Sequence, residues 1–206
     1  MNVSIEERTV LAEQELAQQL AWLSPQDTLR GMFFRSVQEA LLALRGEAAL
    51  EVCLEACGGV RDFVDFFAYP ARDFVRMLGR AATLMAEGDC SSEDMMRMLG
   101  YLGTAVFLKS PVGRAMDVLS SGTPRRVLEN LPMAYQVLTP MAGPLTVTWL
   151  SPTRARVTFT RALLPSAYLE GLLEALLKKA GARGVRVACQ RLGPLSSEHD
   201  LTWSVS

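Results

Sequence analysis

The spacing of apolar residues changes at Gly143-Pro144 from the period of a helix to the period of a strand. Before this point, apolar side chains recur every three or four residues, which predicts amphipathic helices. After it, apolar residues alternate with polar ones over 145–149 and again over 155–159. Alternation of this kind is typical of strands with one buried face. The chain is therefore expected to be neither a pure helical bundle nor a pure β-sandwich.

Turn and capping residues divide the first part of the chain into helical segments. We expect helices over 4–22, 29–45, 47–57, 70–86, 93–108 and 111–120, and a last short helix around Leu128 that ends near Leu131-Pro132. Asp27 or Thr28 is expected to cap the second helix. Gly46 is expected to end it. The aromatic-rich stretch 61–70 is expected to connect two helices.

The second part of the chain is expected to form a compact ββαββ unit. The two alternating segments predict a hairpin, a strongly apolar helix follows over 165–180, and further strands are expected over 185–189 and 201–205. The fold class is then α+β, with an N-terminal helical layer followed by a C-terminal ββαββ module that carries a four-stranded antiparallel sheet. We expect residues 1–23 to form a separate N-terminal helix. Residues 24–206 would then form one α+β domain, with a helical part over 24–140 and a ββαββ part over 144–206.

Composition limits the environment in which the chain works. Half of its 206 residues are hydrophobic and 21% are charged, which excludes a disordered chain. No apolar run is long enough to predict a membrane span, and the acidic N-terminus lacks a signal-peptide pattern. The four cysteines contain no CxxC pair, so reduced thiols and a cytoplasmic protein are expected.

The net charge of −1 hides an asymmetry between the two parts of the chain. Residues 1–108 carry 9 lysines and arginines against 16 acidic residues, whereas residues 109–206 carry 12 against 6. Opposite charges of this size favour association, either within one chain or between chains. Two solvated surfaces are the simpler interpretation of the same pattern.

Several motifs resemble those of a family of uncharacterised proteins restricted to myxobacteria. They are SPQDTLRGMFF (24–34), FVDFFAYPARDFVRML (63–78), SPVGR (110–114), LENLPMAYQ (128–136), YLEGLL (168–173), GARGVRV (181–187) and HDLTWSV (199–205). The resemblance covers about residues 24–206. It implies a shared fold, and it names no chemistry.

The order of elements is also similar to a fold shared by haem-NO-binding sensors, vinyl-reductase-type small-molecule domains and trafficking-complex subunits. This is an analogy of fold, which does not fix function. The chain departs from the haem sensors because its single histidine, His199, begins an expected strand, whereas those sensors carry an axial histidine on a helix. It departs from the vinyl-reductase type because only Cys189 falls in the closing hairpin.

Aromatic residues and methionines supply the candidate lining of an apolar ligand pocket. The candidates are Phe33, Phe34, Phe66, Phe67, Tyr69, Met77 and Met98. The alternative interpretation of the same spacing is a filled core between helices. Four arginines are candidate contacts to an anion or a partner: Arg30, Arg114, Arg125 and Arg126.

Other chemistries lack the residues they need. Cys53 and Cys57 share a helix face and would need Cys90 and His199 to complete a zinc site. No second close pair exists, so no metal site and no bound cofactor are predicted. No nucleophile-elbow, Walker or dinucleotide motif is present, and no catalytic residue is assigned. Arginines on the outer sheet face lack interleaved aromatics, which argues against nucleic-acid binding.

These observations lead to two competing functions and a third that is disfavoured. The first is a non-catalytic signalling or adaptor domain that acts by association with a protein partner or with a second copy, as a homodimer. The alternative is a sensor that holds a small apolar ligand between the helices and the sheet. Enzyme activity is the disfavoured third.

Overall fold

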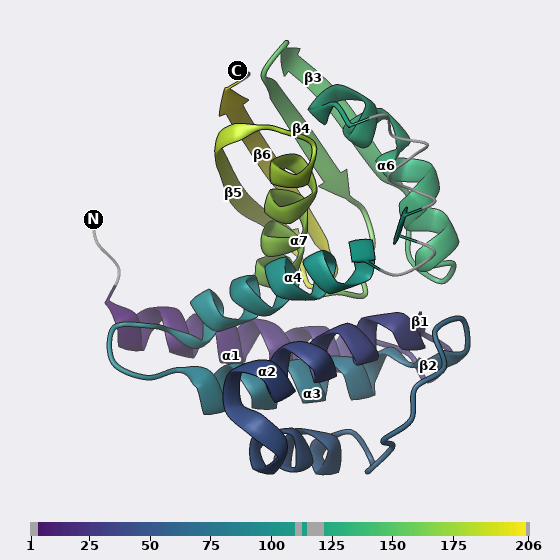
Figure 1. The fold of residues 1–206 in the computed structure, drawn as a ribbon. Coiled ribbons are helices and arrows are strands. Elements are labelled where there is room, and N and C mark those ends of the chain that lie inside the picture. The colour runs from purple at the N-terminus through teal and green to yellow at the C-terminus, as the bar shows by residue number, and fades with distance from the viewer. Residues whose placement is uncertain (1–3, 110–112, 115–121, 205–206) are drawn as a thin grey trace.

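The computed structural model describes residues 4–109, 113–114 and 122–204. Four helices form the N-terminal layer: α1 (Ile5–Trp22), α2 (Gly31–Ala56), α3 (Ala71–Met85) and α4 (Ser92–Lys109). They lie below the sheet-bearing part in Figure 1. Helix α1 begins at a capping box, in which the Ser4 hydroxyl accepts from the Glu7 N–H and the Glu7 carboxylate accepts from the Ser4 N–H. The predicted helical layer is confirmed.

Helix α2 contains a kink where the sequence predicts a break. Gly46 has φ 76°, in the left-handed region that favours glycine. The two expected helices, 29–45 and 47–57, therefore adjoin at this residue as one kinked element.

A short antiparallel ribbon precedes α2 and was not expected from the sequence. Strand β1 (Thr28–Arg30) pairs with β2 (Ala68–Pro70), which lies within the aromatic-rich connection. The expectation that Asp27 or Thr28 caps α2 is wrong, since Thr28 is in β1. Asp27 instead accepts from the Ser24 N–H at 2.7 Å and from the Arg161 guanidinium.

Helix α6 (Pro124–Leu138) is longer than predicted. We expected it to end near Leu131-Pro132 because proline lacks the N–H of a helical hydrogen bond. It continues because Leu131 and Tyr135 are buried on one side, with the Tyr135 ring packed edge-on at 5.1 Å from that of Phe159. Packing outweighs the local cost of Pro132. The helix expected over 111–120 lies, except for residues 113–114, outside the described residues.

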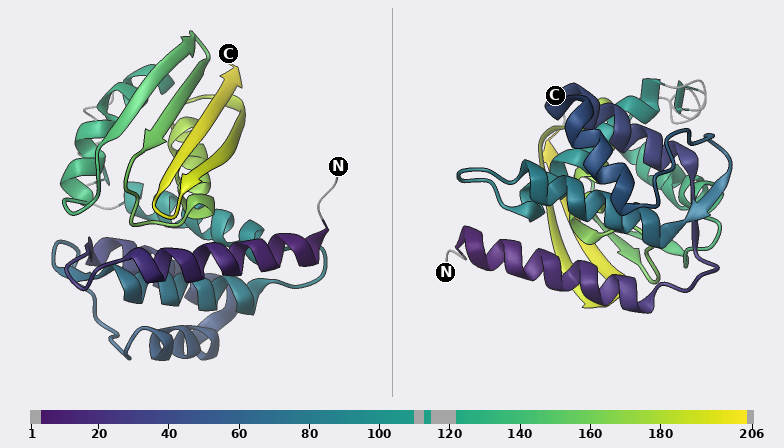
Figure 2. Two further views of the ribbon diagram at one scale, coloured as in Figure 1. Left: turned by 180° about the vertical axis from the view of Figure 1, so that it is seen from behind. Right: turned by 90° about the horizontal axis from the view of Figure 1, so that it is seen from below.

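The C-terminal part is a ββαββ module, as predicted. Its elements are β3 (Leu145–Ser151), β4 (Arg154–Phe159), α7 (Ser166–Lys179), β5 (Arg183–Gly193) and β6 (Ser196–Ser204). The strands are all antiparallel, in the order β3-β4-β6-β5. Helices α6 and α7 lie on one face of the sheet, and the view from behind in Figure 2 shows no described helix on the other face. The α+β class is thereby confirmed.

The two layers meet where α4 crosses α7 at backbone contact distance. A Cβ atom on Gly171 would lie 1.9 Å from the Arg97 carbonyl oxygen, and one on Gly100 would lie 2.1 Å from the Tyr168 carbonyl oxygen. Only glycine at both positions allows this approach. One hydrophobic core extends through the contact into both layers.

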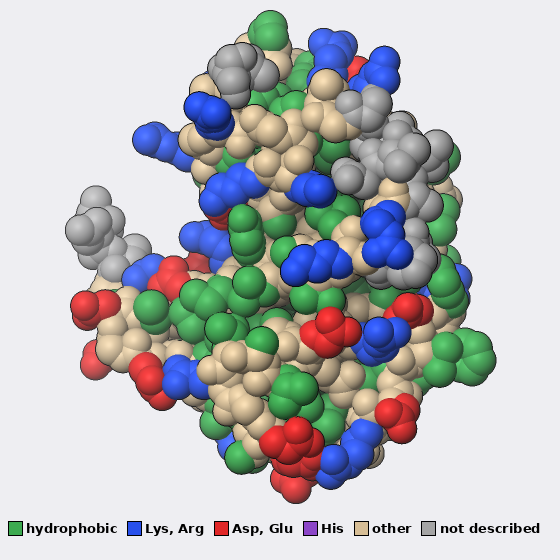
Figure 3. All heavy atoms as spheres, in the orientation of Figure 1, with side chains coloured by type: hydrophobic (Ala, Val, Ile, Leu, Met, Phe, Trp, Pro, Cys, Tyr) green, Lys and Arg blue, Asp and Glu red, His purple; other side chains and the backbone are tan. Residues whose placement is uncertain are grey.

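Ion pairs also join the acidic and basic parts of the chain. Asp27 pairs with Arg161 at 2.7 Å and Glu15 with Arg191 at 3.7 Å, whereas the pair of Arg97 with Glu170 has the opposite polarity. Figure 3 shows the same division on one face, with basic side chains prevailing above and acidic ones gathered below. Acidic groups of the first part and basic groups of the second part therefore attract one another within a single chain. None of the described helices has the length and apolar run that a membrane crossing requires.

Candidate ligand cavity

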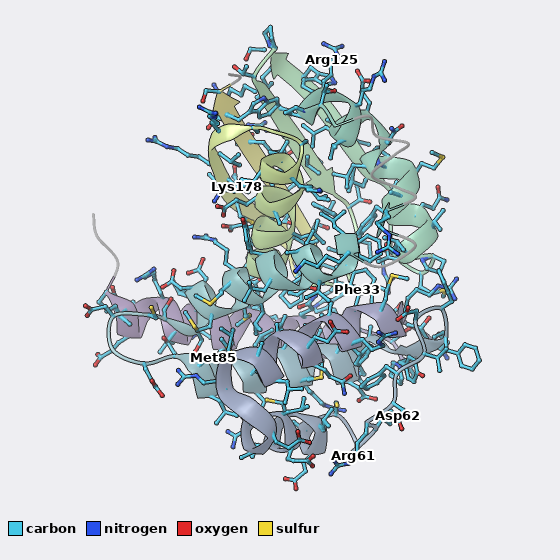
Figure 4. The ribbon with its side chains drawn as sticks, in the orientation of Figure 1. Phe33, Arg61, Asp62, Met85, Arg125 and Lys178 are labelled. Carbon is cyan, nitrogen blue, oxygen red and sulfur yellow. The ribbon has the colours of Figure 1, made fainter. Side chains whose placement is uncertain are left out.

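A cavity of about 460 Å³ lies between helices of the two layers. Its walls come from α2, α4, α6 and α7, with Phe66 and Leu164 added from connecting segments. Figure 4 shows Phe33 at this junction, whereas Arg61 and Asp62 lie at the far end of the helical layer. We expected a pocket between helices and sheet, but no described strand residue lines this one. The reason is that α6 and α7 themselves cover the inner sheet face.

The lining is mostly apolar, and two of its hydroxyls already have partners, whereas the buried Tyr135 hydroxyl has none among the described residues. The Ser36 hydroxyl donates to the Phe33 carbonyl, and the Thr104 hydroxyl donates to the Gly100 carbonyl, both at 2.8 Å. Burial raises the pKa of Tyr168 to about 12, partly offset by its hydrogen bond with Ser36. A bound molecule would therefore meet shape and apolar surface with few free hydrogen-bonding groups.

Two of the seven candidate pocket residues line this cavity, Phe33 and Phe66. Phe34 and Met77 are fully buried in the core, Tyr69 is half-buried, and Phe67 and Met98 are exposed. The Phe34 ring stacks on that of Phe63 at 4.4 Å. Most of this aromatic cluster thus fills the helical layer.

The four candidate arginines all make contacts within the chain. Arg30 donates to the Phe66 carbonyl at 2.6 Å, and Arg114 donates to the Lys109 carbonyl. Arg125 pairs with Glu129 at 2.8 Å and lies 5.0 Å above the centre of the Trp149 ring. The backbone N–H of Arg126 donates to the Thr123 hydroxyl at 3.4 Å. The guanidinium groups of Arg30 and Arg114 thus bond to backbone carbonyls of this chain.

Sequence reasoning missed the cavity residues on α6 and α7. They include Leu131, Tyr135, Leu172 and Leu176. Their helical spacing was visible in the sequence, but a helix face that borders a cavity has the same pattern as one that borders a filled core. Because α6 was predicted to end near Pro132, Tyr135 was not expected to lie on this helix.

The comparisons with known proteins agree with this architecture. Residues 23–204 match the model of a family described as a protein of unknown function, DUF2378. The chain belongs to the DUF2378 family. This confirms the resemblance to an uncharacterised family. No curated protein matches the chain.

Solved structures of H-NOX proteins share the fold of this DUF2378 chain. The Fe(II) unliganded H-NOX protein from K. algicida is 11% identical, with a TM-score of 0.67 over 86% of this chain and 98% of that one. The I5F mutant of T. tengcongensis H-NOX is 14% identical, with a TM-score of 0.67 over 85% and 98%. A third similar structure comes from work on haem redox potential and porphyrin distortion, at 14% identity, TM-score 0.63, and 84% and 99% coverage. The predicted fold-level likeness to haem-NO-binding sensors is confirmed.

The cavity of this DUF2378 chain does not fit a haem held in the usual ways. Protein ligands to haem iron are histidine, thiolate, tyrosinate, or methionine together with histidine. The single histidine, His199, and the four cysteines are all outside the lining. Burial raises the pKa of Tyr135, which opposes a tyrosinate there. Met32 and Met133 line the cavity without a histidine beside them.

The cysteines weighed for zinc do not come together with His199. Cys53 and Cys57 are buried in the helical layer, Cys90 is exposed, and His199 is buried on β6 with its ring 5.3 Å from that of Phe159. Within the described residues, a different set of metal-ligating side chains does converge, around His199 and away from the cavity.

Proposed function

We propose that this chain is a sensor domain that binds a small, apolar, uncharged molecule in the cavity lined by α2, α4, α6 and α7. The observation that carries the proposal is the cavity itself, because its volume lies within the about 300–1,000 Å³ typical of small-molecule sites. Its apolar walls favour such a ligand, as do the internal hydrogen bonds of the Ser36 and Thr104 hydroxyls. The shared fold with H-NOX proteins supports a ligand-sensing role over that of a purely structural adaptor.

The expected affinity follows from the area that such a ligand buries. About a dozen buried CH₂ groups contribute about 10 kcal/mol, at about 0.8 kcal/mol each. Association costs at least about 4 kcal/mol. The remainder of at most about 6 kcal/mol corresponds to a Kd of about 40 μM or weaker. Binding should therefore be measured at probe concentrations of about 10 μM and above.

The test uses N-phenyl-1-naphthylamine, an apolar fluorescent probe. We expect saturable binding by the wild-type chain and binding weaker by at least about 10-fold in Ala134→Phe, because Ala134 lines the cavity and a ring there fills it. Gln136→Phe is the matched control, since Gln136 is exposed on the same helix and outside the lining. Probe binding that is absent from the wild type, or equal in all three proteins, would overturn the proposal.

A haem titration separates this sensor from the haem-binding proteins of the same fold. We expect added haem to give no Soret band of a stoichiometric, histidine-ligated complex, because His199 lies outside the lining. A stoichiometric haem complex that Ala134→Phe abolishes would show that the cavity is a haem site.

The mouth of the cavity supports a second part of the proposal, namely signalling through a second copy or another protein. Phe66, Met133 and Val137 line the cavity and are also more than half exposed. Exposed apolar residues grouped in this way are typical of interaction surfaces. We propose a cytoplasmic, non-catalytic domain that forms a homodimer. Light scattering that shows a strict monomer at high concentration, with and without the probe, would contradict the homodimer.

A further inference from the structure

Three metal-ligating side chains converge beneath α7, outside the cavity. Glu170 on α7, Cys189 on β5 and His199 on β6 each offer a ligand atom, and these atoms all lie within 4.8 Å of one another. The Cys189 Sγ atom is 3.9 Å from the His199 Nε2 atom. Glu170 and His199 are buried, and Cys189 is half-buried. The three side chains therefore share one small, partly enclosed volume.

The imidazole in this cluster is completely buried. Its Nε2 atom is 3.0 Å from the Ser197 hydroxyl, and its buried Nδ1 atom has no hydrogen-bond partner among the described residues. Nε2 is the nitrogen that faces the Cys189 thiol, so it is the one that would bind a metal ion, and the Nδ1 atom would then carry the proton.

The surroundings favour a cation. The Glu170 carboxylate lies within 4.8 Å of the Cys189 Sγ atom, so a cation between them would be attracted by its negative charge. Glu15 reaches the edge of the cluster from α1, where its carboxylate accepts from the backbone N–H of Ser166 at 3.2 Å. Arg97 contacts Glu170 through the Oε2 atom, so the Oε1 atom remains for another partner.

We propose that Glu170, Cys189 and His199 form a zinc-binding site with three protein ligands and one exchangeable position. Thiolate, imidazole and carboxylate together match the ligand preference of Zn²⁺. Tetrahedral Zn–S and Zn–N bonds of about 2.3 and 2.0 Å place the two ligand atoms about 3.5 Å apart. The observed 3.9 Å separation needs only a small movement of side chains. Binding would release the Cys189 proton to solvent as the thiolate coordinates the ion.

This site is independent of the cavity, because none of its three residues lines it. The sequence did not predict it, because the ligands lie on α7, β5 and β6 and form no local motif. Failure of the probe experiment above would leave the metal site unaffected, and the reverse also holds.

Cobalt titration of the chelator-treated, full-length protein tests the site. Co²⁺ in a tetrahedral site that includes a thiolate gives intense visible absorption and a sulfur-to-cobalt charge-transfer band. We expect one Co²⁺ per chain with both features, and we expect Zn²⁺ to displace it. A chain that gives no thiolate charge-transfer band at stoichiometric Co²⁺ would overturn the proposal.

Two cysteine variants test which thiol binds the metal ion. Cys189→Ser is expected to lose the charge-transfer band and to weaken Zn²⁺ binding by at least about 100-fold, the upper end of what the loss of outer-shell partners alone costs. Cys90→Ser, at an exposed cysteine remote from the cluster, is expected to keep both the band and the affinity. Equal Zn²⁺ affinity of Cys189→Ser and the wild type would overturn the site.

His199→Asn tests the imidazole, with circular dichroism as the check of folding. If it folds, we expect weaker Zn²⁺ binding and a shifted cobalt spectrum, and an unchanged spectrum would contradict the assignment of His199. If it does not fold, Cys189→Ser decides alone, because Cys189 is only half-buried and serine is nearly isosteric with it.

Discussion

Helix α7 has two very different neighbours. On one side it touches α4 backbone to backbone, through Gly100 and Gly171. On the other side it faces α6 across a cavity of about 460 Å³. The same helix is thus packed closely against one neighbour and separated from the other by a space. The difference predicts that side chains on the cavity side adapt to a ligand, because the close α4–α7 contact leaves no room for rearrangement.

The nature of the contacts explains this difference. At the α4 crossing, small residues allow main-chain atoms to meet, and such contacts cannot repack. At the cavity, long side chains such as Met133 and Leu176 line the gap. Flexible side chains of this kind adapt to ligands of different shape. Both properties suit the proposed sensor, namely closely packed helices on one side and adaptable side chains on the other.

The largest expected effect comes from breaking the rigid contact. In Gly171→Ala, the new methyl group would meet the Arg97 carbonyl oxygen at 1.9 Å, which the two backbones cannot relieve without moving apart. We expect a loss of at least about 3 kcal/mol in the free energy of unfolding, measured by urea denaturation.

Gly193→Ala is the control, because no atom lies within 4 Å of its added Cβ. We expect the free energy of unfolding to change by less than about 1 kcal/mol in this variant. Equal stability of the two variants would show that α4 and α7 are not in rigid contact.

Two leucines of α7 compare the filled core with the cavity wall. Leu169 is fully buried, whereas Leu172 is half-buried and lines the cavity. We expect Leu169→Ala to cost about 3 kcal/mol of unfolding free energy and Leu172→Ala about 1 kcal/mol, since less packing is lost beside an existing cavity. Thermal and urea denaturation measure both. A larger loss in Leu172→Ala would indicate that the cavity is filled in solution.

A smaller effect is expected at the N-terminal end of α4, the helix that packs closely against α7. Asp94 accepts from the N–H and hydroxyl of Ser91 and pairs with Arg8 at 3.0 Å. Burial opposes its ionisation, but these hydrogen bonds and Arg8 prevail, so the pKa of Asp94 lies below 3.8. We expect Asp94→Asn to cost about 1 kcal/mol at pH 7.

The pH dependence of this variant follows from the direction of the shift. Because the pKa of Asp94 is lower in the folded chain than in the unfolded chain, its stabilisation is complete above about pH 4 and disappears as the pH falls through the folded value. The difference in melting temperature between wild type and Asp94→Asn should therefore shrink below pH 4. A difference that stays constant down to pH 2 would contradict this role.

Much of the fold could be predicted because it depends on local patterns. The change of period at Gly143-Pro144 located the boundary between the two parts, and Gly46 marked the kink in α2. The predictions were wrong where contacts between residues far apart in the sequence determine the local structure. Asp27 is bound by Arg161 from the β4–α7 connection, and Tyr135 packs on Phe159 from β4. Neither partner is visible within a window of neighbouring residues.

The candidate site was less predictable than the fold. Of the seven aromatic and methionine candidates, Phe33 and Phe66 lie in the cavity wall, and Phe34 and Met77 are core residues. The pattern of apolar residues indicates which side chains are buried. It does not indicate whether a buried side chain packs against another side chain or borders a cavity. The polar cluster of Glu170, Cys189 and His199 was missed because its members lie on three elements.

The amino-acid sequence by itself determined the order of the main helices and of the strands of the four-stranded sheet, and with them the α+β class, because hydrophobic periodicity and turn residues act over a few neighbours. Its motifs also indicated the family. Only the tertiary structure decided which helices meet and which leave a gap. That outcome depends on how long side chains and glycines of different elements fit together, as at Gly171 against Arg97. Such fits are set by three-dimensional volume, which no spacing along the chain encodes.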